Sequence, residues 1–198
     1  MVQLAHRYHR CGWLLGTSGN LSALFTGEDG HERIVVTASG QDKGALHTEA
    51  FVEMNLDGTV HRAAEGHKPS AEASIHLALY GGLQECTMVL HVHTVASSLA
   101  LPSAGQVPGC ITFQGLEMLK GWGLWEENAE AVLPVFANHA HVPEIADAVR
   151  AYLRTPPSVP ALLIAGHGLT AWGRTYSEAH RHVEITEFMC RVAIERMS

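Results

Sequence analysis

The chain has 198 residues, 46% of them hydrophobic and 17% charged, which is an ordinary composition for a globular protein. Its formal net charge of −7 argues against nucleic acid or an anionic membrane as the main partner. No apolar run approaches the roughly 20 residues of a membrane helix, and we expect no export signal. The four cysteines lack a C-x-x-C pair. We therefore expect a cytoplasmic protein with reduced thiols.

The first half of the chain predicts a helix, several short strands and a second helix, in that order. Asp57-Gly58, between two β-like runs, is the strongest hairpin signal in the chain. The second helix opens near Ser70, which we expect to be its N-cap, and continues to about Tyr80. The other expected elements are helical residues within 2–15, a loop at 16–20, and strands at 21–25, 33–37, 51–56 and 59–62.

The second half predicts further strands alternating with helices. Thr94 follows a buried strand and is expected to cap a short helix. The pattern between residues 102 and 131 predicts only a short helix near 116–121. The remaining expected elements are strands at 87–92, 133–136, 160–165 and 169–172 and helices at 95–101, at 142–152 and from about Tyr176. The last helix has one broad apolar stripe, formed by Ala179, Val183, Ile185, Phe188, Met189, Val192 and Ala193.

His91 and His93 stand at the end of an apolar, strand-like run. In a strand, residues i and i+2 project from the same face, so both imidazoles can reach one ion. Neutral imidazole nitrogen suits zinc and other late first-row divalent metals. Two polar residues on an exposed strand face would have the same spacing, so the pair alone leaves both interpretations open.

His167 favours the metal interpretation. It lies between two glycines after a second apolar strand, where a bare turn can approach another part of the chain closely. A catalytic zinc site typically has three protein ligands and one open position. His91, His93 and His167 fit that count. His139 and His141 have the same spacing as the first pair but no apolar run before them, so we do not expect the metal there.

Two loops, at residues 16–22 and 37–43, are rich in Gly, Ser, Thr and Asn. Such loops expose backbone N–H groups and hydroxyls that can hold an anion. Lys43 would add a positive charge, and the stretch from Lys68 to Ser70 adds donors at a helix N-terminus. Each stretch taken singly is also typical of a simple turn. Together with three histidines they predict a site for a phosphorylated small molecule.

Two glutamates are candidates for further roles. Glu72 lies in the first turn of its expected helix, where it would also simply favour the helix dipole. Glu117 lies in an apolar neighbourhood, which would raise its pKa and suit acid/base catalysis. A solvated position on a short helix is the alternative for Glu117.

Taken together these segments resemble the class II aldolase and adducin family over almost the whole chain. The resemblance implies one domain over residues 1–198 with a three-layer α/β/α fold around a mixed, mainly antiparallel sheet. It implies one Zn²⁺ per subunit on the three histidines and a homotetramer with active sites near subunit interfaces. The motifs that carry it are Gly19-Asn20-Leu-Ser22, Thr37-Ala-Ser39-Gly40, Lys68-Pro-Ser70-Ala-Glu72, His91-Val-His93 and Gly166-His167-Gly168.

The resemblance also implies roles for individual residues. Phosphate would be held by Asn20, Ser39, Gly40 and Ser70. Residues 113–121 resemble the hydro-lyases of this family, which implies dehydration of 5-methylthioribulose 1-phosphate to 2,3-diketo-5-methylthiopentyl 1-phosphate in methionine salvage. Glu117 would then be the catalytic acid/base. Glu72 matches an acidic position of the sugar-phosphate aldolases, so we expect it beside the metal, as a ligand or as the support of one.

Two other functions fit parts of the same pattern. A sugar-phosphate aldolase of the L-fuculose-phosphate type, or a pentulose-phosphate epimerase, would use the same metal site, but the segment around Glu117 disfavours them. A non-catalytic module like the adducin head domains would need no metal ligands, whereas all three histidines are present.

Overall fold

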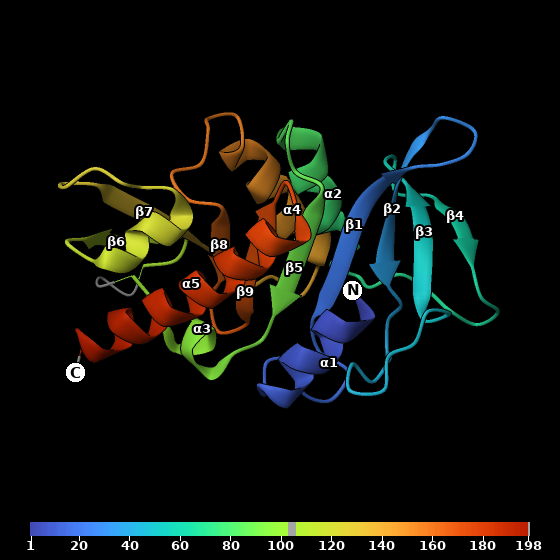
Figure 1. Ribbon diagram of the computed structural model, residues 1–198, viewed down its shortest axis with the longest axis horizontal. Helices are drawn as coiled ribbons and strands as arrows, with labels where there is room; N and C mark the ends of the chain where they lie inside the picture. Colours follow the sequence, from blue (N-terminus) through green and yellow to red (C-terminus); the bar gives the residue numbers. More distant parts are fainter. Residues whose placement is uncertain (103–105, 198) are drawn as a thin grey trace.

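A single nine-stranded sheet forms the centre of the computed structural model, which describes residues 1–102 and 106–197 (Figure 1). The strand order is β4-β3-β2-β1-β5-β9-β8-β7-β6, and every neighbouring pair is antiparallel except β7 and β8. The strands are β1 Asn20–Thr26, β2 Glu32–Thr37, β3 Phe51–Asn55, β4 Val60–Ala63, β5 Met88–Val92, β6 Gly109–Gln114, β7 Glu130–Phe136, β8 Ala161–Ile164 and β9 Gly168–Gly173.

Helices cover both faces of this sheet. α2 and α4 pack against each other and enclose one apolar core, while α1, α3, α5 and a 3₁₀ helix, η1, enclose the other. In Figure 1 the long α5 crosses the face opposite α2 and α4. The helices are α1 Val2–Arg10, α2 Ala73–Gly82, α3 Val95–Leu99, η1 Glu117–Trp122, α4 Val142–Tyr152 and α5 Tyr176–Glu195. The expected three-layer α/β/α fold with a mixed, mainly antiparallel sheet is thus confirmed.

β5 lies in the middle of the sheet and is buried along its whole length. Its side chains alternate between the two cores, with Leu90 and Val92 in one and Val89 in the other. Burial on both faces explains why this strand reads as one continuous apolar run. Its register sets His91 opposite Asn20 of β1 on one side and opposite Thr170 of β9 on the other. Three polar side chains therefore stand in one row across the centre of the sheet.

Some predicted elements differ in the structure. α1 ends at Arg10 rather than near residue 15, because the chain turns at Gly12 with a positive φ of 75°. β6 was not predicted at all, although its buried Ile111 and Phe113 alternate with exposed residues in the way of an edge strand. β7 begins three residues earlier than expected, at Glu130. Residues 103–105 of the poorly patterned stretch lie outside the described residues.

The two predicted helix caps have different outcomes. Thr94 caps α3 as expected, because its Oγ1 accepts a hydrogen bond from the Ser97 N–H at 2.9 Å. The prediction for Ser70 is wrong, since α2 begins at Ala73 and has Glu72 at its N-cap position. The segment before α2 pairs with the loop after β2, through a bridge between Ala38 and Pro69, and this contact delays the start of the helix.

The apolar stripe of α5 is also interrupted. Phe188 is 40% exposed, whereas the neighbouring Glu187 is only 5% exposed. Glu187 lies four residues after the buried Val183 and therefore shares its face of the helix. A carboxylate thus occupies a position that a purely apolar stripe would fill. None of the described helices is long and apolar enough to cross a membrane.

The buried sheet predicts a clear difference between two leucine substitutions. Leu133→Ala in β7 removes a fully buried side chain and should lower the free energy of unfolding by about 2–5 kcal/mol. Leu56→Ala, at a position that is 43% exposed, should change it by less than about 0.5 kcal/mol. Urea denaturation followed by circular dichroism measures both. Equal losses in the two variants would contradict the position of β7 in the core.

Candidate metal centre

The end of β5 provides two imidazoles. His91 is the fourth residue of the strand and is 1% exposed, and His93 lies one residue beyond the strand. Both side chains project to the same side, so that their Nε2 atoms are 2.8 Å apart. The backbone N–H of His93 donates to the carbonyl of Trp13 at 2.9 Å, which fixes the chain where it leaves the sheet. The i, i+2 spacing therefore brings the two histidines together as predicted.

His167 reaches the same point from the turn between β8 and β9. Its ring centroid is 5.0 Å from that of His91 and 4.5 Å from that of His93. Gly168 makes this approach feasible, since a Cβ atom there would lie 2.4 Å from the Val92 carbonyl oxygen and 3.0 Å from His93. A bare backbone at residue 168 is what allows the turn to rest against the end of β5.

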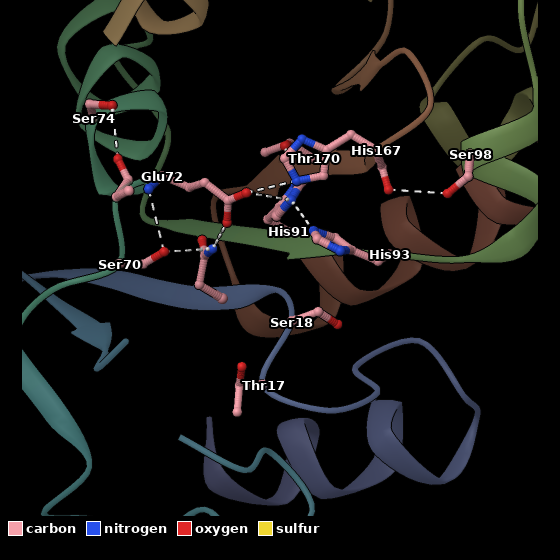
Figure 2. Close-up of polar contacts among 12 residues, drawn as sticks. Thr17, Ser18, Ser70, Glu72, Ser74, His91, His93, Ser98, His167 and Thr170 are labelled. Carbon is pink, nitrogen blue, oxygen red and sulfur yellow. Dashed lines mark hydrogen bonds and ion pairs between the residues drawn. The ribbon is translucent and has the colours of Figure 1, made fainter. Parts of the chain in front are cut away.

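Glu72, just before α2, completes a cluster of four side chains with the three histidines. Its Oε1 is 2.8 Å from His167 Nε2 and 3.5 Å from His91 Nε2 (Figure 2). Burial would raise the pKa of this carboxyl, but the charge of His91 and the hydrogen bonds from His167 and His91 outweigh that effect and hold it well below its ordinary value. We call Glu72, His91, His93 and His167 the His/Glu cluster.

The donor atoms of the His/Glu cluster suit a divalent metal ion. One ligand atom from each of the four residues lies within 4.8 Å of the others, which is compact enough for a single ion. Three imidazole nitrogens and a carboxylate oxygen are ligands that zinc accepts. His91 Nδ1 lies 2.9 Å from Thr170 Oγ1, and donation to that hydroxyl would leave Nε2 free as a ligand. The residues therefore fit a metal site.

Burial favours the neutral form of the second imidazole, that of His93. The pKa of His93 is lowered to about 3, first by its removal from water and then by the neighbouring His91 and His167. The neutral form of an imidazole is the one that binds a metal. Meanwhile His167 Nδ1 is buried without a hydrogen-bond partner in the described part of the chain.

The three predicted anion-binding loops meet beside the His/Glu cluster. Asn20 Nδ2 donates to Ser70 Oγ at 3.2 Å and also to the Glu72 carboxylate. The backbone N–H of Ser39 donates to the Lys68 carbonyl at 2.8 Å, which joins the loop after β2 to the segment before α2. Gly40, next in the chain, is exposed and adopts a positive φ of 72°. Asn20 thus links the candidate phosphate donors directly to the candidate metal ligands.

Lys43 lies deeper than a surface phosphate ligand. It is 1% exposed, and its Nζ donates to the carbonyls of Thr17 and Gln41, each at 2.9 Å. Burial lowers its pKa, while Glu72 and Asp42 act in the opposite direction. The ammonium group therefore fastens two of the loops together and has one further N–H available.

Glu117 is not part of the His/Glu cluster. Its side chain is 82% exposed and forms an ion pair with Lys120 at 2.8 Å. The expected apolar neighbourhood is wrong, because the apolar residues around it in sequence turn inward from η1 while Glu117 points to solvent. The alternative position on a short, solvated helix describes this chain better.

Two contacts of the site were missed by the sequence analysis. Thr170 supports His91, and its only sequence signal is a polar residue inside the buried β9 run. The Asn20–Glu72 contact joins residues 52 apart, and only the strand register reveals it. The second His-x-His pair, His139 and His141, lies at the surface beside Glu144.

Comparisons with known proteins agree with this geometry. Residues 1–194 match the model of the class II aldolase and adducin N-terminal domain. The chain is 40% identical over 204 residues to a methylthioribulose-1-phosphate dehydratase of Leptospira biflexa, covering 100% of this chain and 96% of the relative. It is 39% identical to the enzyme of that name from Microcystis aeruginosa, covering 98% of this chain and 93% of the relative. The solved L-fuculose-1-phosphate aldolase from Thermus thermophilus shares the fold, with a TM-score of 0.71 and 22% identity over 98% of this chain and 91% of the other.

The His/Glu cluster predicts where metal binds. His93→Ala removes one of three imidazole ligands and should abolish stoichiometric metal after dialysis against a metal-free buffer. His139→Ala changes the surface pair with the same spacing and should leave metal content unchanged. Metal analysis by plasma mass spectrometry measures both. Loss of metal from His139→Ala, with full metal in His93→Ala, would place the site elsewhere.

Proposed function

We propose that this chain, which belongs to the class II aldolase and adducin family, is a hydro-lyase that removes water from 5-methylthioribulose 1-phosphate. The observation that carries the proposal is the His/Glu cluster joined through Asn20 to anion-binding loops, in a chain 39–40% identical to relatives named for this reaction. The product is 2,3-diketo-5-methylthiopentyl 1-phosphate, and the reaction belongs to methionine salvage.

The arrangement of the site suits the substrate. The substrate has a phosphate on C1 and a ketone on C2, so its anionic group and its reactive carbonyl are neighbours. We propose that the phosphate is held by the loops that contain Asn20, Ser39, Gly40 and Ser70, with the buried Lys43 ammonium group beneath them. Because Asn20 contacts Glu72, the phosphate would lie beside the His/Glu cluster, and the C2 carbonyl would face it.

We infer that the resident metal is zinc, one per subunit, held by His91, His93 and His167. Imidazole-rich sites with one open position are typical of catalytic zinc. When bound, the ion supplies Lewis acidity that polarises the substrate carbonyl. Glu72 either joins the ligands or keeps the His167 ring in place, as its 2.8 Å contact with that ring indicates.

Glu117 has the role of moving protons. A carboxylate removes the proton on C3, which the neighbouring ketone acidifies, and the same group in its acid form protonates the C4 hydroxyl as it leaves as water. The resulting enol has its double bond between C3 and C4 and its hydroxyl on C3. It becomes the 2,3-diketone when C4 takes up a proton and the C3 hydroxyl loses one. One C–H and one C–O bond break, and no carbon–carbon bond does. An aldolase would instead cleave between C3 and C4.

Glu117 is proposed to act in the site of a neighbouring copy within a homotetramer. In its own copy its carboxylate is exposed and bound to Lys120 rather than to the His/Glu cluster. Apolar side chains near both places are open to solvent: Val95 and Leu99 follow His93 on α3 and are 77% and 58% exposed, and Trp125 near η1 is 70% exposed. Burying such residues favours association.

The cytoplasm is the proposed location. The structure has free thiols at all four cysteines, Cys11, Cys86, Cys110 and Cys190. Reduced thiols are typical of proteins from reducing compartments. The pathway proposed for the substrate is consistent with the same compartment.

The proposed reaction predicts a specific product. Purified protein with zinc should convert 5-methylthioribulose 1-phosphate to the diketone, detected by mass spectrometry as a loss of one water. Treatment with a chelator should remove the activity, and added zinc should restore it. An aldehyde together with a three-carbon phosphate would identify an aldolase and contradict the proposal.

The proposed role of Glu117 predicts that its substitution lowers turnover without affecting metal binding. Glu117→Gln should lower kcat by about 10²–10⁴-fold, as expected when a general acid/base is lost, and should leave the metal content unchanged. Glu126→Gln makes the same change at an exposed residue of the following loop and should retain normal activity. Loss of metal from Glu117→Gln would show that the residue is a ligand instead.

A mixing experiment tests the contribution of a neighbouring copy. Glu117→Gln and His93→Ala should each retain at most a small fraction of the wild-type activity when assayed alone. Mixed and reassembled subunits should regain part of the activity, because some sites combine an intact Glu117 from one copy with intact histidines from another. Absence of any recovery in demonstrably mixed oligomers would mean that Glu117 acts within its own chain.

A further inference from the structure

Glu187 is a buried carboxylate on the layer opposite α2. It lies in the middle of α5, is 5% exposed, and faces α3, against which α5 packs. Its Oε2 contacts the Thr94 hydroxyl, and its Oε1 accepts from Arg191 Nε at 3.0 Å. Arg191 itself is 66% exposed, so the carboxylate and not the guanidinium is the buried partner.

The Thr94 hydroxyl lies near two possible acceptors, the Glu187 carboxylate and the Ser97 Oγ at 2.9 Å, and the charged carboxylate is the stronger of the two. A carboxylate only accepts hydrogen bonds, so the Thr94 hydroxyl donates to Glu187. The same oxygen accepts from the Ser97 N–H at 2.9 Å, which caps α3. Glu187 therefore fixes the orientation of the hydroxyl that starts this helix.

This helix start lies between two members of the His/Glu cluster. Thr94 follows His93 directly in the chain. One turn later, Ser98 Oγ lies 2.9 Å from the Thr94 carbonyl and 3.1 Å from the carbonyl of His167, and Figure 2 shows its contact with the His167 segment. A shift of Thr94 would thus move both the backbone of His93 and the turn that carries His167.

Packing alone does not explain a carboxylate at this position. Most of the other buried side chains of α5 are apolar. A buried charge costs free energy unless it is paired, as this one is with the exposed Arg191. Apolar side chains of similar volume replace buried ionic groups at little cost or with a gain in stability. A carboxylate here is therefore better explained by what it holds than by how it packs.

We propose that Glu187 is a positioning residue for the metal centre. It acts through Thr94, and through Ser98 beyond it, to hold His93 and His167 at the spacing that one ion requires. The proposal rests on the proposed function only in its metal site and does not depend on the reaction.

The test compares Glu187→Met with Glu184→Met. Both remove a glutamate from adjacent turns of α5, but Glu184 is half-exposed and pairs with Arg7, away from α3. Glu187→Met keeps the side-chain volume, so the metal-free protein should unfold at a temperature equal to or above that of the wild type. Its zinc affinity, from competition with a chromophoric chelator, should fall about 10–100-fold, as is typical when the support of a metal ligand is lost. Glu184→Met should bind zinc like the wild type.

Cobalt(II) gives a second readout, because its visible absorption reports ligand geometry. The bands should shift or change intensity in Glu187→Met and stay unchanged in Glu184→Met. Thr94→Val, which lacks the hydroxyl, should reproduce the zinc and cobalt effects, and Thr94→Ser, which keeps it, should restore them. The double variant Thr94→Val/Glu187→Met should be no weaker than the worse single variant, because both changes break one link.

Unchanged zinc affinity and an unchanged cobalt spectrum in Glu187→Met would overturn the proposal, whatever happens to its stability. Should that variant fail to fold, the Thr94→Val and Thr94→Ser pair decides by the same two readouts. The proposed reaction fails separately. A wild type that binds zinc but makes no diketone would refute the reaction, and the weakened binding of Glu187→Met would still support the positioning role.

Discussion

The structure depends on one electrostatic constraint at the end of β5, where an ionised carboxylate and three imidazoles share a half-buried space. Burying any of these groups without a partner costs free energy, and the fold provides each of them with a partner. β1 and β9 flank His91 in register, so that Asn20 reaches Glu72 and Thr170 reaches the His91 ring. The antiparallel pairing of three central strands is therefore what assembles the site.

The same arrangement bears on how a ligand binds but does not determine which reaction follows. Asn20 contacts both Ser70 and Glu72, so the loops proposed to bind phosphate are joined directly to the His/Glu cluster. In the proposed function, these loops hold a phosphorylated ketose beside the metal site, an arrangement that would serve both dehydration and aldol cleavage. The group that determines which bond breaks is not part of these loops or of the His/Glu cluster, and we propose that it is Glu117, which is exposed in its own copy.

The sequence predicts those features that depend on local periodicity. His91 and His93 follow from the period of a strand, and Thr94 from the preference of helix starts for hydroxyls. Predictions of features that depend on contacts between distant residues were wrong or were not made. A bridge to the loop after β2 removed Ser70 from its expected cap. Glu187 contacts Thr94 at the start of α3, which explains why a charged residue lies within the apolar stripe of α5. The direction of the Glu117 side chain could not be predicted, because hydrophobic neighbours in sequence do not determine which way a side chain points from a short 3₁₀ helix.

Two carboxylates from opposite layers converge on this one strand end. Glu72 arrives from the α2 side and contacts His167 and His91 directly, whereas Glu187 arrives from the α5 side and contacts the residue after His93. Because the strand end is held from both faces of the sheet, the spacing of the imidazoles is coupled to the packing of all three layers. A change that repositions a metal ligand must then disturb a core, whereas a change of the exposed Glu117 side chain itself need not. Under the proposed role of Glu117, such a scaffold keeps its metal site constant while one exposed side chain determines which bond breaks.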